Sequence, residues 1–333
     1  MHELLEKLYR QQNLDIDEAK SLFQTMMQGK LDPILIAASL ISLRVKGEYY
    51  TEIAGAAHAL LADAQAFPTP DYSFGDIVGT GGDNSNTLNI STLSAFVATS
   101  LGLKMAKHGN RSVSSKCGSF DFLEELGIPF QLTPTQLRKQ MDETGICFLF
   151  APLFHRGIKH VMPIRKTLKT KTIFNILGPL INPARPKFQM VGVYTPELLL
   201  PIAKVLIELK LQRGFVVHGH GLDEIAPHGE TNIIEIRDGK MKSMTIQPTT
   251  FGFKEFSLAS IQGGEKAENC EKSLRILSGL GSHEEKQMLA MNIAPLLLMD
   301  DKVADLKQGA EMAMEHLKTD HPYQLTQRIA HHE

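Results

Sequence analysis

Apolar residues recur through the first part of the chain at the spacing that places them on one face of a helix. This periodicity predicts helices over Glu3–Tyr9, Asp17–Met27, Ile34–Val45 and Ala54–Ala64. No strand pattern appears before Ala66, after which prolines and a glycine interrupt the sequence. We therefore expect an all-helical N-terminal region that ends near residue 66.

From Asp76 onward, short apolar strands alternate with helices. The strand patterns cover residues 76–78, 104–106, 146–150, 189–194 and 213–218, and the helix patterns cover residues 91–101, 120–126, 135–144 and 196–209. Further runs over 232–237 and 241–246 predict a hairpin through Asp238-Gly239, and helical spacing returns over 284–298 and 302–317. Alternation of this kind is typical of an α/β domain with a largely parallel sheet.

One segment, residues 163–185, breaks this rhythm. It carries a cluster of cations, Arg165, Lys166, Lys169 and Lys171, followed by prolines. A crossover from the α/β region back to the N-terminal helices would account for the interruption, although the pattern alone does not establish one.

The composition is that of an ordinary globular protein. Hydrophobic residues make up 43% of the 333 positions, enough for one large domain and a smaller one. The formal net charge of -2 provides no global positive field for nucleic acid or an anionic membrane, so a site for a polyanion has to be local.

The sequence also bears on the compartment. The three cysteines are widely spaced and fit neither a zinc site nor a disulfide framework. The charged N-terminus lacks the apolar core of a signal peptide, and no apolar run is long enough to cross a bilayer. We therefore expect a reduced, cytoplasmic setting.

A glycine-rich stretch, Gly79–Asp83, directly follows the first predicted strand. Glycines let the backbone approach a ligand closely. Ser91 and Thr92 lie where the next helix begins, so hydroxyls, backbone N–H groups and the helix dipole suit a phosphate or pyrophosphate. A tight turn followed by an ordinary helix cap is equally compatible with the glycine stretch alone, whose spacing matches neither a Walker loop nor a dinucleotide fingerprint.

Cations, serines and glycines are concentrated in Lys107–Ser119, after the second predicted strand. That mixture suits a multiply charged anion, with Lys107 as a point charge and the serines as neutral donors. The alternative is a solvated basic loop, which has no need of glycines beside its charges. For His108, a place in the core and a contact with a ligand are both open.

Two adjacent carboxylates, Asp223 and Glu224, follow the strand predicted over 213–218. Carboxylate oxygens suit Mg²⁺, which takes one or two of them and leaves its other positions to water and substrate phosphates. A solvated turn is the alternative for this pair on its own. Because ligands of open α/β sheets bind beyond the carboxyl ends of the strands, the three loops together predict a Mg²⁺-assisted enzyme acting on a phosphorylated or pyrophosphorylated small molecule.

Taken together, these loops resemble the anthranilate phosphoribosyltransferase family. The resemblance covers most of the chain and is carried by the order and spacing of DIVGTGGD, NIST, KHGNRSVSSKCGS with DFLEELG, FLFAPLFHRGIKHVMPIRKTL, TIFNILGPLINPA and VVHGHGLDEI. It implies the nucleoside phosphorylase/phosphoribosyltransferase type of fold: a small helical domain joined by a hinge to a larger α/β domain with a mostly parallel sheet. The implied domains are residues 1–66, with 163–185 contributing to this helical domain and the hinge, and residues 67–333, which would bind phosphoribosyl pyrophosphate.

The resemblance also implies the reaction. The family transfers the 5-phosphoribosyl group of phosphoribosyl pyrophosphate to the amine of anthranilate, giving N-(5-phosphoribosyl)anthranilate and pyrophosphate, a step of tryptophan biosynthesis. Mg²⁺ is the cofactor, and members are usually homodimers that meet through the helices. No nucleic-acid or membrane partner is expected.

The family's site residues fall on matching positions of this sequence. The donor, phosphoribosyl pyrophosphate, would contact Gly79, Gly82, Asp83, Thr87, Asn89, Ile90, Ser91, Thr92, Lys107, His108, Gly109, Asn110, Arg111, Ser112, Val113, Ser114, Ser115 and Ser119. The acceptor, anthranilate, would contact Gly79, His108, Asn110, His155, Arg165 and Pro179. Mg²⁺ would be held by Ser91, Asp223 and Glu224, and catalytic roles would go to Lys107, Asn110 and Arg165, with Arg165 reading the acceptor carboxylate. Cys117 departs from the family, which commonly has a serine there.

Two other functions remain open from the sequence. A pyrimidine nucleoside phosphorylase shares this fold but uses inorganic phosphate, and the spacing of GTGGD from NIST together with the Asp-Glu pair favours the transferase. A non-catalytic relative that binds nucleic acid should show a basic face and damaged loops, whereas the net charge here is -2 and the motifs are intact.

Overall fold

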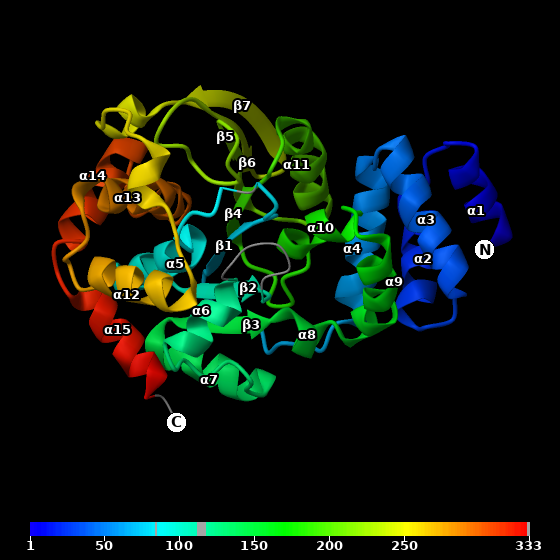
Figure 1. Ribbon diagram of the computed structural model, residues 1–333, viewed down its shortest axis with the longest axis horizontal. Coiled ribbons are helices and arrows are strands. Elements are labelled where there is room, and N and C mark those ends of the chain that lie inside the picture. The colour runs from blue at the N-terminus through cyan, green and yellow to red at the C-terminus, as the bar shows by residue number, and fades with distance from the viewer. Residues whose placement is uncertain (84, 112–117, 332–333) are drawn as a thin grey trace.

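The structure, a computed structural model, describes residues 1–83, 85–111 and 118–331. Its first four helices are α1 (His2–Tyr9), α2 (Ile16–Met27), α3 (Pro33–Lys46) and α4 (Tyr50–Asp63). They form a bundle at one end of the molecule, coloured blue in Figure 1. The all-helical N-terminal region predicted from the apolar periodicity is therefore confirmed.

One buried carboxylate ties this bundle together. Glu52 in α4 is fully buried and accepts hydrogen bonds from the N–H of Leu14 at 3.0 Å and the N–H of Tyr49 at 2.8 Å. Lys46 Nζ lies 2.8 Å from the same carboxylate. Because this ion pair compensates a charge that is removed from water, three separate segments of the bundle share one polar centre.

A seven-stranded sheet forms the centre of the second region, with the strand order β3-β2-β1-β4-β5-β6-β7. Its strands are β1 (Gly75–Gly79), β2 (Met105–Gly109), β3 (Ile146–Phe150), β4 (Phe188–Gly192), β5 (Arg213–Gly219), β6 (Thr231–Arg237) and β7 (Lys240–Ile246). The first five pair in parallel, and β6 and β7 extend the sheet as antiparallel strands. The largely parallel sheet and the hairpin through Asp238-Gly239 are thus confirmed.

Helices pack against both faces of this sheet. Those in direct contact with strands are α5 (Ile90–Ser100), α6 (Ser119–Glu125), α7 (Pro134–Thr144), α11 (Leu199–Glu208) and α13 (His283–Met299). Three more, α12 (Lys266–Leu277), α14 (Leu306–His316) and α15 (His321–Ala330), pack on these helices. Successive strand residues face different cores: Met190 and Phe215 pack with α5 and α13, whereas Val191 and Val216 pack with α11 and the bundle.

The C-terminal helices differ from the prediction at two points. α14 starts at Leu306 instead of residue 302, because Asp305 accepts a hydrogen bond from the N–H of Gln308 at 2.9 Å and caps the helix there. The sequence pattern also misses α12 and α15, whose buried faces include polar residues such as Ser273 and Thr326. No helix in the described part of the chain is both long and apolar enough to cross a membrane.

The segment that interrupts the strand–helix rhythm packs on the bundle. After α8 (Ala151–Phe154), it contains α9 (Met162–Leu168) and α10 (Phe174–Leu177). Ile173 and Phe174 share a core with Phe23 and Leu40 of the bundle, and the rings of Phe174 and Phe23 lie 5.9 Å apart. Residues 163–185, hereafter the crossover, therefore contribute side chains to the core of the bundle and connect it with the sheet.

Candidate active site

Three predicted loops meet at one edge of the sheet. Gly79 ends β1, Gly109 ends β2 and Gly219 ends β5. These strands are parallel, and only β4 separates β1 from β5. Because the carboxyl ends of parallel strands share an edge, the glycine-rich stretch, the first residues after β2 and the Asp223-Glu224 pair converge there.

Glycines at the strand ends make room for the carboxylate pair. A Cβ atom on Gly79 would overlap the carboxylate of Asp223, and one on Gly192 would overlap its backbone carbonyl. A Cβ atom on Gly219 would overlap the carbonyl of Glu224. Any larger residue would push this segment away, so three strand ends fix its position. Gly192, which ends β4, is a site residue that the sequence patterns miss.

Three carboxylates crowd together at this edge. Asp223 Oδ2 accepts a hydrogen bond from the N–H of Gly81 at 2.6 Å, and Glu224 Oε1 accepts one from the hydroxyl of Ser91 at 3.3 Å. Burial and the nearby charge of Asp83 raise the pKa of Asp223 to about 7. Burial, with smaller effects of Asp223 and Asp83, raises the pKa of Glu224 well above its usual range. The cluster therefore resists full ionisation unless a cation joins it.

The oxygen atoms at this edge are suitable ligands for Mg²⁺. The two carboxylates of Asp223 and Glu224 and the hydroxyl of Ser91 are the hard oxygen ligands that this ion prefers. Within residues 1–83, 85–111 and 118–331, no group of three or more His, Cys, Asp or Glu side chains forms a metal cage. A small, open set of protein ligands suits an ion that also coordinates water and the oxygens of a phosphorylated ligand.

The N-terminus of α5 stabilises the carboxylate cluster. Asn89 is the N-cap, Ile90 begins the helix, and both the backbone N–H and the hydroxyl of Ser91 hydrogen-bond to Glu224. The helix dipole adds partial positive charge at this end. The hydroxyl of Thr92 is buried and has no hydrogen-bond partner among the residues that the structure describes. This first turn therefore combines a fixed carboxylate with a hydroxyl that is available to a ligand.

Thr87, also predicted to contact the donor, lies in the connection before α5. It forms an isolated β-bridge with Gln262, and its hydroxyl oxygen is 3.3 Å from that of Ser85. These contacts hold the connection itself and do not involve the carboxylate pair.

Lys107 lies below the loops and not at their surface. It is 1% exposed, and its Nζ donates a hydrogen bond to the carbonyl of Ile77 at 2.7 Å. Burial lowers the pKa of the ammonium, while the charges of Asp76 and Glu224 oppose that shift. The ammonium of Lys107 is therefore close enough to the carboxylates of Asp76 and Glu224 to offset their charge from within the sheet.

The loop after β2 is described in part. Four residues predicted to contact phosphoribosyl pyrophosphate lie outside the described residues: Ser112, Val113, Ser114 and Ser115. Cys117, which departs from the family, also lies outside them. Arg111 directs its guanidinium to α6, where Nη1 and Nη2 donate to Glu124 at 2.6 and 2.7 Å. Asn110 is exposed, and Ser119 is the first residue of α6. The Arg111 side chain is thus engaged in an ion pair with α6, whereas Asn110 is accessible to a ligand.

Two buried histidines lie near each other: the rings of His108, in β2, and His155, which follows α8, are 5.4 Å apart. His108 Nδ1 donates to the carbonyl of Gly178 at 3.2 Å, since a carbonyl can only accept. Burial, with a smaller effect of His155, lowers the pKa of His108 well below its usual range, so the ring is neutral. Its Nε2 is buried without a partner among the described residues and can accept a hydrogen bond from a ligand.

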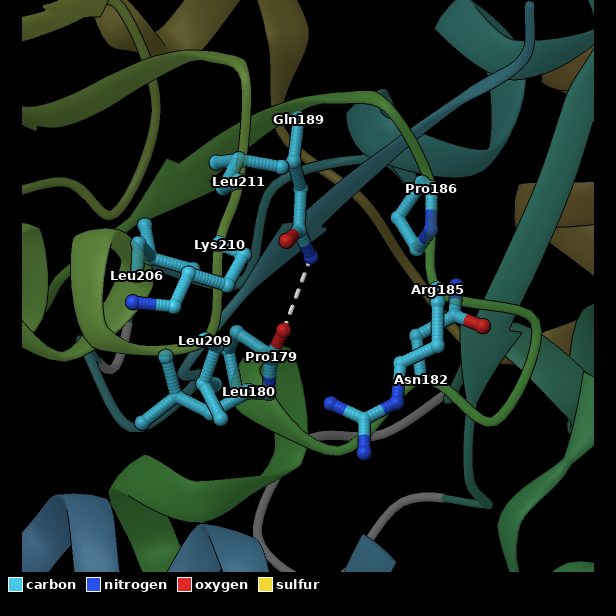
Figure 2. Close-up of a pocket in the computed structure, with 10 residues that line it drawn as sticks. All are labelled: Pro179, Leu180, Asn182, Arg185, Pro186, Gln189, Leu206, Leu209, Lys210 and Leu211. Carbon is cyan, nitrogen blue, oxygen red and sulfur yellow. Dashed lines mark hydrogen bonds between the residues drawn. The ribbon is translucent and has the colours of Figure 1, made fainter. Parts of the chain in front are cut away.

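Pro179 is held by its carbonyl, which accepts a hydrogen bond from Gln189 Nε2 at 2.7 Å (Figure 2). This contact borders a pocket of about 300 Å³, and Figure 2 shows the side chain of Arg185 extending into it. Gln189 is at the amino end of β4, and Leu211 closely precedes β5. The pocket therefore lies toward the opposite edge of the sheet from the carboxylate pair.

Arg165 stands on α9, in the crossover. Its Nη2 donates to Asn175 Oδ1 at 3.4 Å, and its guanidinium lies 5.3 Å from the centre of the Phe174 ring. The N–H of Thr172 donates to the same Asn175 oxygen at 2.9 Å, which fixes that amide. Since these partners are neutral, the positive charge of Arg165 remains available to a carboxylate.

Lys171 is another cation of the crossover, and no sequence pattern assigns it a role. Its Nζ donates to the carbonyl of Gly82 at 2.9 Å and lies 3.6 Å from the centre of the Tyr194 ring. In the sequence its only signal is its place in the cation cluster that begins at Arg165.

Comparison with known proteins identifies the family. The glycosyl transferase family helical bundle domain matches residues 2–64, and the glycosyl transferase family a/b domain matches residues 71–321. The anthranilate phosphoribosyltransferase of Aeromonas salmonicida (strain A449) is 52% identical over 330 residues, which cover 99% of this chain and 98% of that protein. The chain belongs to the anthranilate phosphoribosyltransferase family. Its membership makes it a phosphoribosyltransferase.

Solved structures of anthranilate phosphoribosyltransferases share its fold. The crystal structure of the Thermus thermophilus protein superposes with a TM-score of 0.93 at 36% sequence identity, covering 98% of each chain. The Saccharomyces cerevisiae enzyme in complex with PRPP (phosphoribosyl pyrophosphate) and Mg gives a TM-score of 0.85 at 30% identity, covering 94% of this chain and 91% of that one. The predicted fold class, a helical bundle joined to a larger α/β domain, is confirmed.

We expect Gly192→Ala to lower phosphoribosyl transfer about a hundredfold, because displacing a catalytic group by roughly 1 Å costs on that scale. The new methyl group would overlap the backbone of Asp223. Steady-state rates measure the effect, and circular dichroism verifies folding. Gly214→Ala is the matched control in β5, because its methyl group would meet the flexible end of Leu211 at 2.8 Å. An unchanged rate in Gly192→Ala would show that this strand end does not position the carboxylates.

Proposed function

We propose that this edge of the sheet binds phosphoribosyl pyrophosphate with Mg²⁺ and that the crossover presents anthranilate to it. The 5-phosphoribosyl group then passes to the amine of anthranilate, giving N-(5-phosphoribosyl)anthranilate and pyrophosphate in tryptophan biosynthesis. The observation that carries the proposal is the convergence of a glycine-lined carboxylate pair, a glycine-rich turn and a helix N-terminus. Family membership supports the choice of substrates, and the yeast relative binds PRPP and Mg.

The diphosphate of the donor would lie across the glycine-rich turn and the start of α5. Its contacts are assigned to Gly79, Gly82, Asp83, Asn89, Ile90, Ser91, Thr92, Gly109, Asn110 and Ser119. Asp223, Glu224 and Ser91 would hold Mg²⁺, which when bound supplies positive charge to the departing pyrophosphate. Lys107 and the dipole of α5 add fixed positive potential at the same place, so the protein need not reorganise as charge develops.

The acceptor would lie between the end of β2 and the crossover. Arg165 is assigned to its carboxylate, because the described partners of this guanidinium are neutral. Asn110 and His108 are assigned to its amine, and the unprotonated Nε2 of His108 can accept an amine N–H. His155 would complete the wall of this site, together with Pro179, which directly follows Gly178, the residue whose carbonyl holds His108.

The amine would attack ribose C1 opposite the departing pyrophosphate and invert that carbon. As the bond to pyrophosphate breaks, the sugar gains oxocarbenium character, so stabilising the leaving charge contributes more than activating the nucleophile. An aryl amine is already neutral at pH 7, and we therefore assign no general base. Arg165 and Asn110 contribute by holding the amine in line with C1, where water has to be excluded from the activated sugar.

The domain division and the compartment belong to the same proposal. Residues 1–66, with residues 163–185 as part of the hinge, would form the helical domain, and residues 67–333 would form the donor-binding domain. The packing of α9 against α3 and of the Phe174 ring against the Phe23 ring supports this division. A cytoplasmic location is supported by Cys147 and Cys270, which are free and buried.

The rival functions have less support. A pyrimidine nucleoside phosphorylase does not account for 52% identity to an anthranilate phosphoribosyltransferase along nearly the whole chain. A non-catalytic relative that binds nucleic acid should have lost the arrangement around Asp223 and Glu224, whose glycines and hydrogen bonds are in place here.

Purified protein should consume anthranilate, seen as loss of its fluorescence, only when phosphoribosyl pyrophosphate and Mg²⁺ are both present. Omitting either, or chelating the metal, should reduce the rate to background, because the leaving pyrophosphate needs a counter-charge. Phosphorolysis of pyrimidine nucleosides and gel shifts with DNA test the rival functions on the same preparation. Fluorescence loss without the donor, or phosphorolysis in its place, would exclude the proposed reaction.

Arg165→Ala should raise the KM for anthranilate at least tenfold, roughly the worth of a hydrogen bond between charged groups. The KM for phosphoribosyl pyrophosphate should stay within about twofold, because the guanidinium would touch only the acceptor. Lys166→Ala, which removes the neighbouring exposed cation, is the control. Equal shifts of both KM values in Arg165→Ala would mean that Arg165 does not bind the carboxylate.

We propose that two copies of the chain pair through the bundle. α3 exposes an apolar stripe in which Ile34 is 77% and Val45 71% exposed, about three helical turns apart on one face. Tyr9 and Tyr49 add exposed rings on the same bundle. Apolar surface of this kind is favourably buried in a symmetric pair, and a second copy offers the same stripe.

Ile34→Glu combined with Val45→Glu should convert this dimer to a monomer, because pairing would bury two uncompensated charges from each copy. Size-exclusion chromatography with light scattering measures the mass. Gln28→Glu, an exposed change at the end of α2, should leave the dimer intact. A monomeric wild type, or a double variant of unchanged mass, would show that the stripe on α3 is not the interface.

A further inference from the structure

Lys171, in the crossover, contacts the glycine-rich stretch Gly79–Asp83, and the function proposed above gives it no role. Its Nζ donates to the carbonyl of Gly82, a residue 89 positions away in the chain, at 2.9 Å. Gly82 has a φ of +80°, and a Cβ atom there would lie 3.2 Å from Lys171 Nζ. The lysine therefore packs directly against the glycine-rich turn.

This hydrogen bond fixes the orientation of one peptide unit. The carbonyl of Gly82 and the N–H of Asp83 belong to the same planar trans peptide, so they point in opposite directions. Glycine at positive φ has more backbone freedom than any other residue, and the unit needs an external contact to stay in one orientation. With the carbonyl held by an ammonium, the N–H of Asp83 is directed away from the crossover and can donate to an anion.

Tyr194 holds the ammonium in place. The distance of 3.6 Å from Lys171 Nζ to the ring centre is within the range of a cation–π interaction. The N–H of Tyr194 donates to Thr80 Oγ1 at 3.1 Å, and the N–H of Thr80 donates to the carbonyl of Gly192 at 2.9 Å. The end of β4, the glycine-rich turn and the lysine are thus tied into one unit.

The backbone next to Lys171 is also fixed. Thr172 is buried, and its N–H donates to Asn175 Oδ1 at 2.9 Å. Ile173 belongs to the core shared with the bundle. Because its base is anchored, the lysine loses less conformational entropy in reaching Gly82 than a lysine on a free surface loop would lose.

We propose that Lys171 is a positioning residue for the glycine-rich stretch. It holds the Gly82–Asp83 peptide so that the N–H of Asp83 faces the diphosphate of phosphoribosyl pyrophosphate. The inference rests on the donor half of the proposed function. Losing the ammonium should weaken donor binding, whereas a purely structural lysine would affect stability and leave the affinity unchanged.

The test is calorimetric titration of phosphoribosyl pyrophosphate, in Mg²⁺, into the full chain and its variants. Lys171→Met should raise the donor Kd about tenfold, the scale of one hydrogen bond from a charged donor. Lys171→Arg should restore most of the affinity, because a guanidinium can both donate to the carbonyl and stack on the Tyr194 ring. Lys166→Met removes an exposed cation from the same segment and should bind like the wild type.

A second pair of variants isolates the ring. Tyr194→Phe keeps the aromatic face and should retain the affinity, whereas Tyr194→Leu should weaken donor binding about threefold. Thermal unfolding of each variant separates loss of folding from loss of binding. Equal Kd values for Lys171→Met and wild type, or an equal loss in Lys166→Met, would overturn the inference.

Turnover with anthranilate is scored separately from donor binding. A wild type that binds the donor without transferring its ribose contradicts the proposed reaction and leaves the comparison of Lys171 variants decisive. A wild type with no affinity for the donor contradicts both.

Discussion

The site depends on one steric constraint. The segment 223–224 lies so close to the ends of β1, β4 and β5 that only glycine fits at Gly79, Gly192 and Gly219. This approach forces carboxylates together, and burial, with repulsion from neighbouring carboxylates that include Asp83, raises the pKa of both Asp223 and Glu224. A cation relieves that repulsion, so the position proposed for Mg²⁺ follows from how closely the backbone packs and not from a complete ring of ligands.

The sheet and the crossover contribute different chemical groups to the proposed site. The sheet provides backbone groups, carboxylates and the start of α5 at this edge, and the crossover brings the ammonium of Lys171 to Gly82. Arg165, also in the crossover, is the cation that we assign to the acceptor. The two proposed substrates are both anions, so bringing them together in water would meet electrostatic repulsion. If Arg165 binds the acceptor as proposed, a cation from a separate segment compensates one anion without disturbing the carboxylates assigned to the other.

Much of this arrangement could be predicted, because strands and helices follow simple apolar periodicities and parallel strands bring their carboxyl ends to one edge. Those two regularities are enough to place Gly79–Asp83, Ser91 and the Asp223-Glu224 pair in one site. They cannot find Gly192 or Lys171, whose importance lies in contacts with residues far away in the chain. Periodicity is a local property, and it carries no information about which distant backbone a glycine must accommodate.

The strand order also affects how the chain can fold. β1 pairs with β2 on one side and with the much later β4 on the other, and the carboxylate pair comes only after β5. During synthesis the glycine-rich turn leaves the ribosome long before the residues that pack against it exist. Contacts of such large sequence separation form late and slowly. Affinity for the sugar donor is consequently a property of a nearly finished chain, and the ligand cannot act as a template for early folding steps.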